Sequence, residues 1–387
     1  MDSFYIDGKD YRSGLAVRVK TEGAFISGTE PHDVAGDLEL PVIAPGLVDI
    51  QVNGYAGIDL NNEELTVNDI RRLTEELWSA GVTTFLPTLI TNSSRRISRL
   101  LSTISLACES LPEIRDSIGG IHLEGPFISP VDGPRGAHPA EFVRAPDWDL
   151  FSRWQEEAQG RIRLITLSPE WPGSLPFISK CVRSGVKVAI GHTSATGEMI
   201  RAAVEAGVTL STHLGNASHK MLPRHDNYIW EQLATEETYI SIIADGFHLP
   251  DAVLKVFLKV KPDRTILVSD STSFAGMPAG NYSGHIGSEV ILTPEGKLYI
   301  KGNPDLLAGS GLPLLHCVNT LIKKNITSLA DAWNMGAVKP SEYLSTYEKY
   351  GLIPGSPADM VLVKIGEAGV SVIRTIKSGK TVYKGDI

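Results

Sequence analysis

Four residues that can bind or serve a metal ion each follow an apolar segment of the chain: Glu124, His192, His213 and Asp270. Apolar runs that stop at a functional group are typical of buried strands in parallel β-barrels, which place catalytic groups at the carboxyl ends of several strands. A carboxylate with two imidazoles is a common ligand set for Zn²⁺, and a hydrolytic site leaves a further position open for water. A single buried histidine is more often a packing residue. Two of them that end consecutive strands, beside a carboxylate that ends a third, favour a metal site with Glu124, His192 and His213 as ligands.

Asp270 is not needed to complete that ligand set, and it ends the last predicted strand. A metal ion lowers the pKa of bound water towards ~7, and a nearby carboxylate can accept the proton and later return it. Asp270 could instead cap a helix, but residues 274–278 (FAGMP) do not begin a convincing one. We therefore predict that Asp270 is the general acid/base.

Two further histidines, His138 and His248, lie in predicted loops on the same face. A loop imidazole there can orient a substrate or stabilise an oxyanion, although it can equally be a solvated surface group. His219 and His225 are weaker candidates, and His316 fits a helix-packing role.

The elements that must position these residues alternate between strand-like apolar runs and helix-like periodic segments, a pattern typical of βαβ units. Several predicted helices end at a glycine just before the next strand, where a left-handed cap needs no Cβ: Gly81, Gly160, Gly185 and Gly207. The pattern predicts an α/β fold, a (β/α)8 TIM-type barrel, with strands at 47–52, 83–89, 118–123, 161–167, 186–192, 209–214, 239–244 and 265–270.

The two ends of the chain carry short alternating strands that cannot make a core alone. We expect residues 1–44 and 352–387 to pair as a small β-sandwich beside a barrel of residues 45–351. A hairpin at 290–300 is expected in a loop over the site.

Composition narrows the class of protein. The chain has 387 residues, a net charge of -9 and 42% hydrophobic residues, so it fits an ordinary soluble enzyme and argues against a nucleic-acid partner. The three cysteines show no metal or redox spacing and are interpreted as packing residues. No secretory signal and no apolar run long enough to span a membrane is found, so a cytoplasmic protein without a membrane partner is expected.

Read in order, the motifs resemble the N-acetylglucosamine-6-phosphate deacetylase family of the amidohydrolase superfamily over nearly the whole chain. They are APGLVDIQVNG (44–54), HLEGPF (122–127), GAHP (136–139), GHT (191–193), THLGNA (212–217), ADGFH (244–248), SD (269–270) and LAGS (307–310). Most of the superfamily has His-x-His where this chain has Gln51 and Asn53. The deacetylases often carry Gln-x-Asn there and use one metal ion.

This resemblance implies a deacetylase that holds one divalent ion, expected to be Zn, with Fe, Co or Mn as alternatives. It implies that Glu124, His192 and His213 bind the metal and that Asp270 is the acid/base, with His138 beside it. The remaining residues would contact the small-molecule substrate: Gln51, Asn53, His138, Asn216, Ala217, His248, Leu307 and Ala308. The family also implies a homodimer in which Arg224 reaches the phosphate of the partner's substrate.

The chain departs from the family at that arginine. The usual sequence there is Gly-Arg-x-Pro-Gly, whereas residues 222–230 read LPRHDNYIW. Three functions therefore stay open: the phosphorylated sugar as substrate, another N-acyl amino sugar (galacto or unphosphorylated) or N-acyl amino acid, and a catalytically silent barrel protein. The missing His-x-His pair counts against the many binuclear relatives that act on N-acyl amino acids or open cyclic amides, so the linear acetamide of an amino sugar is favoured.

Overall fold

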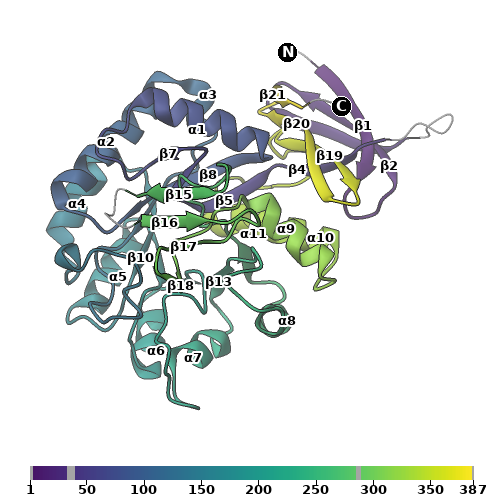
Figure 1. The fold of residues 1–387 in the computed structure, drawn as a ribbon. Coiled ribbons are helices and arrows are strands. Elements are labelled where there is room, and N and C mark those ends of the chain that lie inside the picture. The colour runs from purple at the N-terminus through teal and green to yellow at the C-terminus, as the bar shows by residue number, and fades with distance from the viewer. Residues whose placement is uncertain (1–2, 33–39, 285–288, 386–387) are drawn as a thin grey trace.

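The computed structural model describes residues 3–32, 40–284 and 289–385, and its largest part is a barrel of eight parallel strands (Figure 1). The barrel strands, in spatial order, are β5 (Leu47–Val52), β8 (Val82–Ile90), β9 (Ile121–Glu124), β10 (Ile162–Leu167), β11 (Lys187–Ile190), β12 (Leu210–Ser211), β13 (Tyr239–Ile242) and β14 (Thr265–Leu267). A parallel bridge between Val52 and Ser271 joins the first strand to the segment after the last. The predicted α/β barrel is confirmed.

Helices lie between the strands and bury one apolar face each. They are α1 (Val67–Ser79), α2 (Ser94–Ser110), α3 (Pro112–Arg115), α4 (Trp148–Glu157), α5 (Ser174–Arg183), α6 (Gly197–Glu205), α7 (Tyr228–Ala234) and α8 (Asp251–Val260), with a 3-10 turn at Ala140–Phe142. After β14 come α9 (Leu314–Lys323), α10 (Leu329–Gly336) and α11 (Val338–Leu344). In α1 the buried residues follow helical spacing, and Thr66 and Asp69 form a capping box at its start. The four glycines predicted to end helices all have positive φ.

Every residue of β5 and of β9 is buried, as expected for strands that are covered by helices outside and packed side chains inside. Among the described residues, no helix is long and apolar enough to cross a membrane. All three cysteines are buried and unpaired, as predicted.

The two chain ends form one seven-stranded sheet beside the barrel (Figure 1). Its strands are β1 (Ser3–Asp10), β2 (Ala16–Glu22), β3 (Phe25–Pro31), β4 (Val42–Pro45), β19 (Met360–Gly366), β20 (Gly369–Lys377) and β21 (Lys380–Lys384). Strand β4 joins the two ends, because it pairs in parallel with β1 and antiparallel with β19. The expected pairing of the chain ends is therefore confirmed, in a single hydrogen-bonded sheet. The limits at 44 and 352 stay predictions.

A four-stranded antiparallel sheet follows β14 and crosses in front of the barrel in Figure 1. It consists of β15 (Gly280–Ser283), β16 (Glu289–Leu292), β17 (Leu298–Ile300) and β18 (Asn303–Leu307), and the predicted hairpin is its β16–β17 pair. We call it the cover sheet. Its small hydrophobic core of Val290, Leu292 and Leu298 is separate from the main core. A short ribbon of β6 (Gly54–Tyr55) and β7 (Ile58–Asp59) follows β5.

Candidate metal centre and active site

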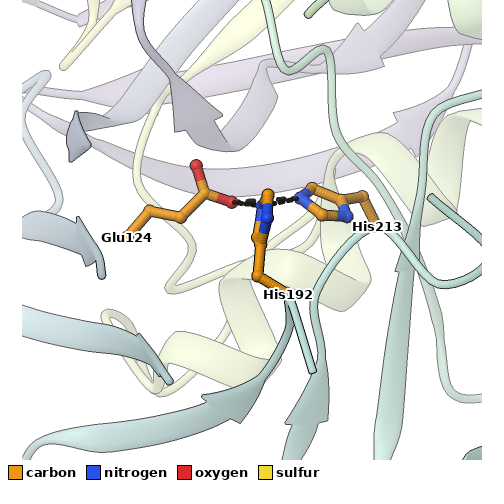
Figure 2. Close-up of side chains that lie close together, drawn as sticks. All are labelled: Glu124, His192 and His213. Atoms are coloured by element: carbon orange, nitrogen blue, oxygen red, sulfur yellow. Dashed lines mark hydrogen bonds and ion pairs between the residues drawn. The ribbon is translucent and has the colours of Figure 1, made fainter. Parts of the chain in front are cut away.

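Glu124, His192 and His213 converge at one end of the barrel, where their ligand atoms lie within 4.8 Å of one another (Figure 2). His213 Nε2 is 3.0 Å from Glu124 Oε1 and 3.1 Å from His192 Nε2, and His192 Nε2 is 3.4 Å from the same carboxylate oxygen. All three side chains are buried. Three strands thus bring two imidazole nitrogens and one carboxylate oxygen to a single point.

The backbone turns sharply at the residues that leave the barrel strands for the site. His192, His213 and Asp270 have φ values of 51°, 31° and 49°, although none of them is glycine. Left-handed backbone is unfavourable for such residues and clusters at functional sites, where the surrounding structure holds it in place. Here it occurs within three residues of the ends of β11, β12 and β14.

The donor set fits a divalent metal ion. His192 Nδ1 is 3.0 Å from the carbonyl oxygen of Pro134, which can only accept, so in the neutral ring Nδ1 carries the proton and Nε2 keeps its lone pair. Metal-bound histidines are held in this way, through the nitrogen that does not bind the ion. Two imidazole nitrogens and a carboxylate oxygen are ligands that zinc and its neighbours accept.

Electrostatics in the cluster favour a charged carboxylate. Burial alone would raise the pKa of Glu124, but hydrogen bonds with His192 and His213 outweigh burial and hold the pKa well below its usual range. Burial also opposes a charge on His213, yet the adjacent Glu124 raises the pKa of that imidazole. The cluster therefore carries a negative oxygen where a cation would be held.

Asp270 lies beside the cluster and is linked to it by Gln51. The Gln51 amide donates to Glu124 Oε1 at 2.9 Å and to Asp270 Oδ1 at 3.2 Å, and Asn53 Nδ2 donates to the same Asp270 oxygen at 2.7 Å. Burial, followed by the charge of Glu124, raises the pKa of Asp270 to about 6. A carboxyl group with that pKa can both take up and release a proton near neutral pH.

The cluster opens into a pocket of about 590 Å³. His138 lies in its wall, with Nδ1 2.8 Å from Thr91 Oγ1 and its ring centroid 4.4 Å from that of His192. Burial lowers the pKa of His138 to about 3, so its imidazole is neutral. The other predicted contact residues that line the pocket are Asn53, Asn216, Ala217, His248, Leu307 and Ala308.

Two predicted contact residues, Gln51 and Arg224, do not line the pocket. Gln51 instead contacts Glu124 and Asp270, whereas Arg224 lies away from the site. Arg224 is exposed, and its carbonyl oxygen accepts a hydrogen bond from Trp230 Nε1 at 3.3 Å. His219, a weaker candidate in the sequence, does line the pocket, and its Nδ1 is 3.0 Å from the Tyr228 hydroxyl. Lys220 and Lys297 also line it.

Sequence reasoning missed several polar residues that support the site. Asp245 contacts His248, and Ser310 contacts Asp245. Glu170 Oε2 accepts from Thr193 Oγ1 and the Ser194 amide, both at 2.8 Å, and so holds the segment after His192. For Asp245 a signal was available, because a carboxylate three residues before a loop histidine can reach its ring. Nothing in the sequence singled out Glu170.

Comparison with known proteins shows which family has this sequence and fold. The amidohydrolase family model matches residues 42–382. An N-acetylglucosamine-6-phosphate deacetylase from Bacillus subtilis is 32% identical over 88% of this chain and 85% of its own length, and the one from Homo sapiens is 29% identical over 98% and 93%. The crystal structure of the N-acetylglucosamine-6-phosphate deacetylase from Thermotoga maritima has a TM-score of 0.84 and 27% identity, covering 99% of this chain and 100% of its own. The chain therefore belongs to the amidohydrolase family.

Proposed function

We propose that the protein hydrolyses the acetamide of N-acetylglucosamine-6-phosphate to glucosamine-6-phosphate and acetate. The observation that supports this most is the convergence of Glu124, His192 and His213 next to Asp270 in the lining of the pocket. The activity for which the nearly end-to-end relatives are named supports the same substrate. In this proposal Glu124, His192 and His213 hold one divalent ion, with Zn²⁺ favoured over Fe, Co or Mn. When bound, that ion would supply Lewis acidity, which lowers the pKa of water and polarises a carbonyl.

Asp270 is assigned the proton transfers. Gln51 and Asn53 both donate to its Oδ1, so Oδ2 is the oxygen assigned to exchange the proton. Asp270 accepts a proton from the attacking water and returns it to the departing amine. His138 remains neutral next to the cluster and is assigned contact with the acyl carbonyl, where it can stabilise the oxyanion.

The remaining pocket residues are assigned to substrate binding. His248 is assigned to the sugar, Asn216 and Ala217 to the phosphate end, and the backbone around Leu307 and Ala308 to the acyl group. Because Arg224 lies outside the pocket of its own chain, a phosphate role for it requires a homodimer, which we include in the proposal. The cytoplasm is the proposed location.

The first experiment measures acetate release from N-acetylglucosamine-6-phosphate and from the unphosphorylated sugar, with Zn²⁺ supplied. We expect a strong preference for the phosphorylated sugar. The exposed position of Arg224 favours one competing function, deacylation of another N-acyl substrate, and little activity on the phosphorylated sugar with metal bound would support it.

The Asp270→Asn variant tests the assigned base. Asparagine keeps the size of the side chain but cannot take up the proton, so we expect normal metal content and a loss of activity on the order of 10²-fold or more. Metal content by mass spectrometry and acetate release are measured on the same sample. Full turnover by the variant would eliminate Asp270 as the base.

A further inference from the structure

Asp245 is a buried carboxylate that the proposed mechanism does not use, and it receives four hydrogen bonds. It follows β13 by three residues. Its Oδ1 accepts from the amides of Phe247 and His248 at 2.9 and 3.0 Å. Its Oδ2 lies 2.8 Å from His248 Nδ1 and accepts from Ser310 Oγ at 3.1 Å. So many donors around one carboxylate define its orientation completely.

The contact with His248 determines the state of that imidazole. Burial raises the pKa of Asp245, but the hydrogen bonds and charge of His248 outweigh burial and lower it to about 2, so Asp245 is ionised at neutral pH. An ionised carboxylate can only accept hydrogen bonds, so His248 Nδ1 must carry a proton. Because His248 lines the pocket and its Nδ1 faces Asp245, Nε2 is left for the substrate.

Ser310 extends the same network to the cover sheet and to the proposed base. It follows Leu307, the last residue of β18, and the loop residues Ala308 and Gly309, and all three line the pocket. Its amide donates to the carbonyl oxygen of Asp270 at 2.9 Å, and its carbonyl oxygen accepts from the Thr272 amide at 3.1 Å. The hydroxyl bond from Ser310 to Asp245 therefore ties the loop after the cover sheet to the loop that carries His248.

We propose that Asp245 is a positioning residue for substrate binding and turnover: it fixes the proton on Nδ1 of His248 and, through Ser310, holds the 307–310 loop beside Asp270. This inference rests on the proposed function, because it gives His248 a substrate contact. Fixing a ring by a buried carboxylate also sets which nitrogen the substrate meets, as in other sites where a carboxylate orients a histidine.

The kinetic test uses Asp245→Asn. The asparagine oxygen can still accept from the two amides, but its NH₂ group faces His248 Nδ1 and Ser310 Oγ, which favours the opposite tautomer. We expect kcat/KM for N-acetylglucosamine-6-phosphate to fall on the order of 10- to 100-fold, with metal content and thermal unfolding close to those of the unchanged protein. Asp251→Asn is the matched control, because Asp251 also follows β13 but lies half exposed against Lys324, outside the pocket lining.

A double-mutant cycle separates positioning from a general structural role. If Asp245 acts mainly through His248, Asp245→Asn in a His248→Gln background should cost no more than the several-fold loss expected from the Ser310 contact. Its full fold-loss in that background would overturn the proposal. Ser310→Ala tests the second arm, and we expect it to lower kcat/KM several-fold while Nδ1 of His248 stays protonated.

A readout without substrate keeps this test independent of the proposed function. Histidine labelled with ¹⁵N distinguishes protonated from unprotonated ring nitrogens, and the His248→Gln variant identifies the signals of His248. We expect a protonated Nδ1 in the unchanged protein and an unprotonated Nδ1 in Asp245→Asn. An unprotonated Nδ1 in the unchanged protein, or no change in the variant, would overturn the inference. If the unchanged protein releases no acetate but the expected signals appear, the proposed substrate is wrong and the positioning role stands.

Discussion

Asp49 is a completely buried carboxyl group. It contacts Gln51, whose side chain donates a hydrogen bond to the proposed base, Asp270. Asp49 Oδ1 accepts from the amide of Gln51 at 3.2 Å and from that of Ser269 at 3.3 Å. Burial, only partly offset by these hydrogen bonds, raises the pKa of Asp49 to about 7. The group therefore binds its proton more tightly in the folded protein than in the unfolded chain, where an aspartate has a pKa of about 3.9.

This difference predicts how stability depends on pH. A carboxyl group whose pKa is raised on folding makes the protein less stable as the pH rises from about 4 to 7, by ~1.4 kcal/mol for each pH unit in that range. The Asp49→Asn variant keeps a side-chain oxygen for both amides and has no proton to lose. We expect the stability advantage of the variant over the unchanged, metal-free protein to grow from about pH 4 to pH 7 and to level off above pH 7, as measured by urea unfolding. A difference that does not vary with pH would contradict the assignment.

At the residue scale, the sequence singled out the three side chains that the structure brings together as a candidate metal cluster, because a carboxylate and imidazoles at strand ends have few other reasons to recur. It could not predict that His192, His213 and Asp270 adopt left-handed backbone, since that depends on the surrounding packing. For Arg224 the sequence suggested a role but not the position of the side chain. Its type fits phosphate, but a residue type does not show whether the side chain reaches the pocket.

The cover sheet is an element with its own stability. Leu292, Val290 and Leu298 form a cluster separate from the core of the barrel. Val290 and Lys297, which lies in the turn between β16 and β17, line the pocket. Segments with few buried apolar contacts open at a lower free-energy cost than the whole domain. Order in the cover sheet is therefore expected to affect substrate binding more than global folding.

We expect Leu292→Ala to raise KM several-fold with a small loss of unfolding free energy, because the loosened sheet still leaves the barrel intact. Leu164→Ala, in β10 of the main core, is the matched control and should cost about 2–5 kcal/mol of unfolding free energy. Acetate-release kinetics and urea unfolding measure the two effects. Equal losses of stability in both variants would show that the cover sheet folds as one unit with the barrel.

At the element scale, the sequence predicted every barrel strand but made several too long. The expected strand at 209–214 became a two-residue β12, and the one at 186–192 became β11, which ends at Ile190. Apolar residues continue past these strands because the loops that follow are also buried, for example at Leu214. Burial alone therefore does not mark where strand hydrogen bonding stops.

The buried Lys377 fastens the seven-stranded sheet of the chain ends to the barrel: its ion pair lies within the chain-end segment, and its hydrogen bond to Thr84 reaches the barrel. Lys377 Nζ, at the end of β20, lies 2.6 Å from Asp359 Oδ2 and 3.2 Å from Thr84 Oγ1 of β8. The side chains are only 3% and 0% exposed. Burial opposes a charge on Lys377, but the carboxylate of Asp359 outweighs burial and raises the pKa of the amine.

Removal of one partner leaves the other as an unpaired buried charge. We expect Lys377→Met to cost about 3–5 kcal/mol of unfolding free energy, as seen when buried pairs are broken. The double variant with Asp359→Asn should recover a large part, because no charge remains and the asparagine oxygen still accepts from the Ser378 amide. Urea unfolding tests this, with Lys324→Met as the exposed control at ~0–1 kcal/mol. A cost for Lys377→Met no larger than the control's would refute the fastening role.

Strand β4 also limits when the seven-stranded sheet of the chain ends can be completed during synthesis, because one of its partners is made much later. Ala44 pairs with Val361 in the finished sheet, and only Gly46 separates β4 from β5, the first strand of the barrel. During synthesis on the ribosome, the β19 edge of β4 stays unpaired until β19 itself, Met360–Gly366, has emerged. Exposed strand edges invite wrong pairing. Products that stop before β19 thus carry an open strand edge next to the first barrel strand, and we expect chaperones and proteases to act on them more readily than on finished chains.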